Sequence, residues 1–156
     1  MDCRKGYQRR ERIAVVRMSI YVVLSSDKSS RYFPNNNPFS FKSHLNAPIV
    51  LEGTWKVALV EVDITSKLSK EDPIYVYSSI CQESIVEGEK KPLLRRLMSN
   101  GPGDWTTLID SPHYLPVNTN ELYDIEIYIT DRHNDTASFL DQPSTLTLHF
   151  KSFPFF

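Results

Sequence analysis

The sequence predicts an all-β protein, and more specifically a single jelly-roll β-sandwich of about eight antiparallel strands in two sheets. Residues 122–130 and 145–152 alternate between apolar and polar side chains, the period of two that is typical of a strand with one buried face. Turn-rich segments separate further extended runs, and no stretch shows a helical period. An immunoglobulin-like sandwich is the main alternative, but the sequence lacks the Cys…Trp…Cys arrangement of that fold.

The first extended runs lie on either side of a long polar loop. Residues 20–24 are predicted to form the first strand, and residues 25–38, rich in Ser, Asn and Pro, form the loop after it. Residues 39–51 alternate again and predict either one bent strand or two short ones. Glu52 and Gly53 then make a turn.

The strand expected at residues 55–64 changes its apolar face near Leu59. Trp55 belongs to one face, whereas Val62 and Ile64 belong to the opposite face. A β-bulge would produce this switch, and so would a strand that is buried on both faces. In the second case, one face would pack against the opposite sheet and the other against a loop or a neighbouring subunit.

The second half of the chain contains the remaining extended segments. They are predicted at residues 74–81, 92–98, 105–109, 113–117, 122–130 and 145–152, with a charged turn at residues 87–91. Tyr75 and Tyr77 share a face, and with Tyr128 they form either a packed aromatic row or an exposed stripe for a protein partner. Tyr123 is expected on the same buried face as Ile125.

A chain of 156 residues is long enough for one domain with its own core. Residues 1–17 hold six basic and two acidic residues, a net charge of +4 that leaves −5 for the rest of a chain whose total is −1. We expect this basic leader to lie outside the domain of residues 18–152, as a solvated tail or as a tether to DNA or an acidic partner. Met18 is an alternative start. The acidic body argues against nucleic-acid binding elsewhere.

No pattern in the sequence points to catalysis or to a cofactor. The histidines lack metal-ligand spacing, and no nucleophile elbow or phosphate-binding loop is present. His149 is expected on the polar face of its strand, as a surface or cross-strand residue. Cys3 and Cys81 make no disulfide framework, which fits a reducing compartment. No apolar run approaches the roughly 20 residues that span a bilayer. We therefore expect a non-enzymatic protein without metal, cofactor or membrane span.

Two runs of residues carry a resemblance to a known family. They are Gly53-x-Trp55-x-Val57-x-Leu59-x-Glu61 and Pro112-His113-Tyr114-x-Pro116, accompanied by residues 21–25, 31–35, 92–95 and 145–150. In this order the segments resemble the penton (minor capsid) proteins of Polinton or Maverick elements and adintovirus-like DNA viruses. The resemblance covers residues 19–152. None of these segments is a catalytic motif, so the resemblance concerns kinship more than mechanism.

The resemblance implies a virion protein that assembles as a pentamer at icosahedral vertices, beside trimers of a double-jelly-roll major capsid protein. Each subunit of such a ring needs two different contact patches, because the contacts are heterologous. The candidate interface residues are Trp55, Val60, Val62 and Ile64 in the two-faced strand and Phe153, Phe155 and Phe156 in the apolar tail of residues 153–156. The connection at residues 65–74 is shorter than the resemblance leads us to expect.

A second class of function remains open on the residues alone. Tyr32, Phe33 and Trp105 are aromatic residues on expected loops and strand faces. Such residues also suit a ligand-binding β-sandwich that recognises a carbohydrate or a protein, for instance a viral gene put to host use. The tail phenylalanines fit either a chain end that folds back on the sandwich or one that docks on another chain.

Overall fold

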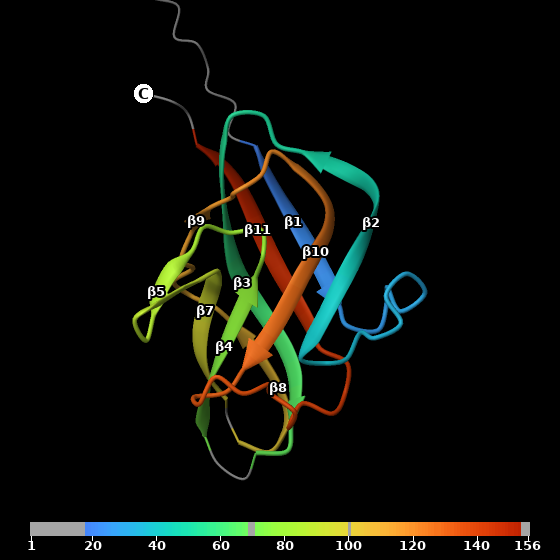
Figure 1. Cartoon of the computed structure of the whole chain (residues 1–156), viewed down its shortest axis with the longest axis vertical. Helices are drawn as coiled ribbons and strands as arrows, with labels where there is room; N and C mark the ends of the chain where they lie inside the picture. Colours follow the sequence, from blue (N-terminus) through green and yellow to red (C-terminus); the bar gives the residue numbers. More distant parts are fainter. Residues whose placement is uncertain (1–17, 69–70, 100, 154–156) are drawn as a thin grey trace, which may run out of the picture.

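The computed structural model describes residues 18–68, 71–99 and 101–153, and the regular structure of these residues consists of β-strands (Figure 1). The longer strands are β1 (Ser19–Ser25), β2 (Ser40–Val50), β3 (Thr54–Ser66), β4 (Asp72–Ser78), β7 (Leu93–Ser99), β8 (Gly103–Leu108), β10 (Glu121–Thr130) and β11 (Thr145–Phe153). The shorter ones are β5 (Ser84–Val86), β6 (Glu89–Lys91) and β9 (Leu115–Pro116). The basic leader and residues 154–156 of the tail lie outside the described residues.

The strands form two antiparallel sheets that pack face to face. One sheet has the order β1-β11-β3-β8, with β9 beside β3, and the other has the order β2-β10-β4-β7. Figure 1 looks through both layers, with β2, β10 and β4 in front of β1, β11 and β3. Counting the longer strands alone, successive strands alternate between the sheets except at β4 and β7. This interleaving is that of a jelly roll, so the predicted fold class is confirmed.

The core lies between the sheets and is made of the side chains that alternate inward along each strand. In β10, Ile125, Ile127 and Ile129 are fully buried, and in β11 the same holds for Leu148 and Phe150. The alternation of apolar and polar residues in the sequence therefore corresponds to burial against the opposite sheet. Within residues 39–51, expected as one strand or two, Ser40–Val50 form the single strand β2.

A β-bulge explains the change of apolar face in β3. Thr147 of β11 pairs with Glu61, but the next residue, Leu148, pairs with Leu59, so that Val60 has no partner of its own. The extra residue shifts the alternation by one position, and Leu59 and Val62 both reach the core. Of the two explanations that the sequence allowed, the structure supports the bulge.

A second irregularity overturns the expectation for Tyr123. Leu122 pairs with Ile49, but Asp124 pairs with His44, so β2 carries several more residues than β10 across this step. The break lets Leu122 point into the core with 2% exposure, while Tyr123 is 54% exposed. The predicted alternation was wrong here because it assumed an uninterrupted ladder.

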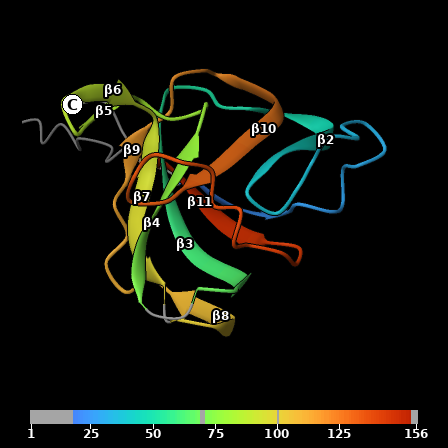
Figure 2. The same ribbon diagram turned by 60° about the horizontal axis from the view of Figure 1, so that its bottom comes forward.

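Strands β5 and β6 form a small hairpin beside the sandwich where the sequence suggested only a charged turn (Figure 2). Val86 pairs with Glu89, which leaves Glu87 and Gly88 as a two-residue loop. Both residues have positive φ, 48° and 80°, as a type I′ turn requires.

Replacing Gly88 by alanine is expected to destabilise the protein by roughly 1–2 kcal/mol, the cost of a left-handed conformation for a residue with a side chain. A Cβ at this position meets no atom within 4 Å, so backbone strain alone is responsible. Urea unfolding would measure the change, with Glu89→Ala in the same hairpin as the control. A Gly88→Ala protein as stable as its parent would contradict the prediction.

The two ends of the described chain meet at one end of the sandwich. β1 and β11 are neighbours, and Ser19 lies opposite Lys151. The Met18 carbonyl accepts a hydrogen bond from the Ser152 backbone N–H at 2.9 Å. In Figure 1 the loop after β3 and the loop after β10 lie at the opposite end.

Candidate assembly surfaces

The outer face of the β1-β11-β3-β8 sheet carries large apolar side chains that are open to solvent. Val23 of β1 and Leu108 of β8 belong to one cross-strand row through Thr147 and Glu61, and they are 64% and 69% exposed. Tyr21, in the next row, is 65% exposed. We call Tyr21, Val23 and Leu108 the outer apolar face. Thr147 and Glu61 lie between Val23 and Leu108, so the three side chains are separate exposed apolar positions on one face of the sheet.

The structure distributes the predicted interface residues between the core and the surface. Trp55, Val62 and Ile64 are at most 6% exposed and pack in the core of their own chain, so they offer almost no surface to a second subunit. Val60 and Phe153 are half-buried, and the Lys56 ammonium lies 4.6 Å from the centre of the Phe153 ring. Phe155 and Phe156 lie outside the described residues.

His149 lies on the same outer face as the cross-strand partner of Tyr21, one of the two positions that the sequence allowed, and it is buried beneath two tyrosines. Its ring stacks on Tyr21 at 4.2 Å, and its Nδ1 atom lies 2.9 Å from the Tyr114 hydroxyl. The Lys151 ammonium covers the Tyr114 ring at 4.4 Å. The Nε2 atom of His149 is buried without a hydrogen-bonding partner among the described residues. Burial lowers the pKa of His149, and the charge of Lys151 lowers it further.

This arrangement predicts that the protein loses stability as the pH falls below about 6.5, the ordinary pKa of histidine. Between that pH and the lowered pKa of the folded state, the unfolded chain binds more protons at His149, so the free energy of unfolding decreases with falling pH. Urea unfolding across this range would measure the slope. The His149→Phe variant keeps an aromatic ring but does not titrate, and it should show a shallower slope. Equal slopes would contradict the prediction.

On the other sheet, the tyrosine row is packed and not open. The rings of Tyr77 and Tyr128 stack at 4.8 Å with 12° between their planes, and Tyr75 follows at 6.5 Å. Tyr77 is only 2% exposed, and burial raises the pKa of Tyr128. Of the two interpretations of these tyrosines, the structure favours packing over a free aromatic stripe.

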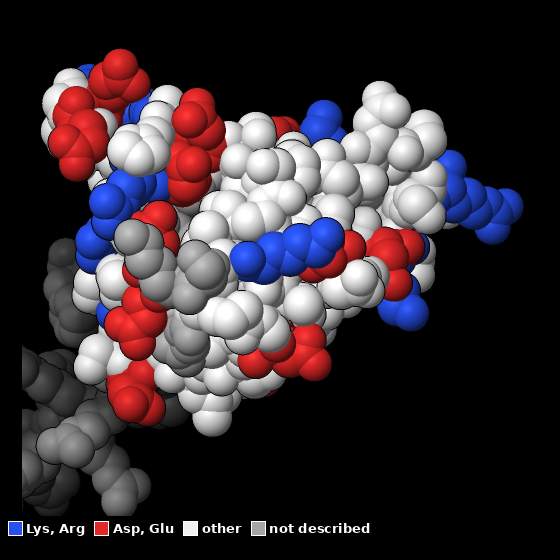
Figure 3. Space-filling model, turned by 90° about the horizontal axis from the view of Figure 1, so that it is seen from below, with Lys and Arg blue, Asp and Glu red and all other residues white. Residues whose placement is uncertain are grey.

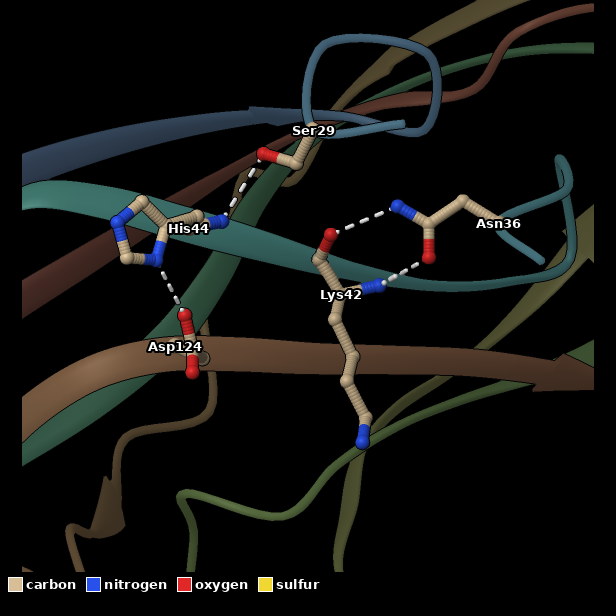
Figure 4. A network of polar contacts seen from close by, with 5 residues as sticks. All are labelled: Ser29, Asn36, Lys42, His44 and Asp124. Carbon is tan, nitrogen blue, oxygen red and sulfur yellow. Dashed lines mark hydrogen bonds and ion pairs between the residues drawn. The ribbon is translucent and has the colours of Figure 1, made fainter. Parts of the chain in front are cut away.

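The long loop before β2 is tied to the free edge of that strand, the edge that does not pair with β10 (Figure 4). The Ser29 hydroxyl accepts a hydrogen bond from the His44 backbone N–H at 2.9 Å. The Asn36 amide donates to the Lys42 carbonyl at 2.8 Å and accepts from the Lys42 N–H at 2.9 Å. The Nδ1 atom of His44 lies 2.9 Å from Asp124 of β10. These contacts fix the loop against the sheet.

Two further features are the distribution of charge at one end of the molecule and the thiol of Cys81. On the one face that Figure 3 shows, acidic and basic side chains lie interspersed among neutral ones, without a continuous basic surface. Cys81 is fully buried, and burial raises its pKa to about 11, which leaves little thiolate at neutral pH.

In residues 18–68, 71–99 and 101–153 no group of three metal-ligating side chains gathers. None of these segments forms a helix that could cross a membrane.

Strand order and sheet pairing define the protein as a single jelly roll. It is similar to the crystal structure of the selenomethionine-labelled mavirus penton protein, with a TM-score of 0.55 and 8% sequence identity. The match covers 87% of this chain and 100% of that chain. No protein-family model matches the sequence, and no curated protein matches it.

Sequence analysis did not find the surface cluster of Tyr21, Tyr114 and His149. Tyr21, Tyr114 and His149 come from separate segments, and only strand pairing brings them together. Trp105, one of the aromatic residues considered for ligand binding, is 6% exposed in the core. Tyr32 and Phe33 are instead beside a surface hollow. The sequence signal that could have indicated this hollow is the position of the two aromatic residues in a loop rich in asparagine.

Proposed function

We propose that this protein is a structural component of a virion, a penton-like minor capsid protein that forms the pentameric vertex capsomer of an icosahedral DNA virus. The observation that carries the proposal is the likeness to the mavirus penton protein over the whole length of that chain. The sequence resemblance to the pentons of Polinton or Maverick elements and adintovirus-like viruses points the same way. The protein acts without catalysis, within the host cell before assembly and in the capsid afterwards.

The distribution of exposed apolar side chains supports self-association. A closed ring joins two unlike patches of neighbouring subunits, and the outer apolar face supplies one of them. Ile85 in the β5–β6 hairpin and Met98 on β7 are 68% and 45% exposed and belong to different parts of the fold, so they are candidates for the second patch. Neighbouring capsomers of a double-jelly-roll major capsid protein are the second partner that the proposal implies.

The mass of the purified protein in solution tests this proposal. Residues 1–156 and residues 18–156 should be measured over a range of concentrations, because the basic leader is a candidate for contact with DNA or an acidic partner and its removal should leave the ring intact. A fivefold mass in either form, with five-fold symmetric particles in electron micrographs, is the expected result. Monomers in both forms at all concentrations would argue against a subunit that assembles by itself.

A further inference from the structure

A hollow of about 270 Å³ opens between the loop before β2 and the outer face of β2 and β10. Tyr32, Phe33 and Asn35 line it from the loop, and Lys42 and Glu126 line it from the two strands. Its volume is slightly below the roughly 300–1,000 Å³ of typical small-molecule sites. The hollow therefore suits a ligand of about one ring.

Hydrogen bonds hold the walls of this hollow in place. The paired contacts between the Asn36 amide and the Lys42 backbone join the loop to β2. The Phe33 N–H donates to the Ser29 carbonyl at 2.9 Å, and the Asn37 side chain accepts from the Ser40 N–H at 2.8 Å. A site whose walls are already fixed needs little ordering when a ligand binds.

Tyr32 is positioned by a chain of contacts that starts on β10. Its ring stacks on His44 at 4.2 Å, with 29° between the planes, and Asp124 in turn holds His44. Tyr32 nevertheless remains 54% exposed. A tyrosine that is fixed from one side and open on the other offers a surface for a flat, weakly polar ligand face.

Two charged side chains complete the hollow without neutralising each other. Lys42 and Glu126 are cross-strand neighbours on β2 and β10, yet no ion pair joins them in the described chain. The Lys42 ammonium lies 5.8 Å from the centre of the Phe33 ring. The hollow thus offers an ammonium donor and a carboxylate acceptor beside aromatic rings.

We propose that this hollow binds a single neutral sugar unit, such as a hexose or an N-acetylhexosamine at the end of a glycan. The C–H face of the sugar packs on Tyr32, its hydroxyls donate to the Glu126 carboxylate, and another hydroxyl accepts from Lys42. Glu126 disfavours phosphates and other anions, and the charged groups disfavour an apolar ligand. The inference is independent of the proposed capsid role, because it concerns one domain and requires no assembly.

Saturation-transfer NMR with a panel of free sugars tests this inference. The panel contains glucose, galactose, mannose, fucose, N-acetylglucosamine and N-acetylgalactosamine, each added to the full-length protein. We expect transfer to the ring protons of at least one of them. Tyr32→Ala and Glu126→Gln should each weaken binding of that sugar about tenfold. Tyr123→Ala is the matched control, because it removes another exposed tyrosine outside the hollow.

Two results would overturn the proposal. One is the absence of saturation transfer to every sugar of the panel. The other is transfer that survives in both Tyr32→Ala and Glu126→Gln. Both variants alter side chains that lie at least partly at the surface, and circular dichroism would confirm that they fold. A monomeric protein that still binds the sugar would leave this inference standing while counting against the capsid role.

Discussion

Replacing Phe150 by alanine is expected to destabilise the domain by about 3–5 kcal/mol, the usual result of truncating a buried aromatic side chain. Phe150 is fully buried and lies on β11, which pairs with β1 on one side and β3 on the other. The lost contacts therefore affect the centre of the sheet. Since folded domains are stable by only about 5–15 kcal/mol, a large part of the protein's stability would disappear.

Urea unfolding followed by circular dichroism would measure this change in the free energy of unfolding. Tyr123→Ala is the control, because it removes an aromatic ring of similar size that is 54% exposed, and it should cost well under 1 kcal/mol. Equal destabilisation by the two substitutions would show that the assigned burial of β10 and β11 is wrong.

In the assembly proposed above, placing an aspartate at Val23 is expected to shift the protein to monomers while leaving the domain folded. Val23 is 64% exposed in the single chain, so the fold tolerates a charge there. Burying an unpaired carboxylate between subunits is strongly unfavourable, which would shift the equilibrium toward the free subunit. The measured quantity is the mass in solution as a function of concentration.

Val50→Asp provides a control of the same chemistry. Val50 is 59% exposed at the end of β2 in the other sheet, away from the outer apolar face. We expect Val50→Asp to assemble as the parent does. Normal assembly of Val23→Asp would exclude the outer apolar face as a subunit contact.

Much of the fold follows from local alternation in the sequence. Ile125 and Ile127 could be assigned to the core because the alternation of β10 is regular after its break at Tyr123, and Phe150 because the alternation along β11 has no break of its own. The sequence of β3 showed that its alternation changes phase near Leu59. It could not show whether a bulge or double burial was the cause, because that depends on the pairing with Thr147 and Leu148 of β11.

Tyr123 and His149 show where local alternation fails. Tyr123 is turned outward by extra residues in β2, a strand distant in the sequence. His149 does point away from the core, as its polar neighbours suggested, but Tyr114 from another segment covers it. Both outcomes depend on non-local partners. For the same reason, the hollow beside Tyr32 could not be derived from the order of residues in its loop alone.

The meeting of Met18 and Ser152 at one end of the sandwich makes the fold suitable for circular permutation. A short linker could join residue 153 to residue 18 without crossing either sheet, since β1 and β11 are already hydrogen-bonded neighbours. New ends could then be opened in the exposed turn at residues 132–136 at the far end of the molecule. A peptide fused at those new ends would be displayed from the opposite pole of the domain.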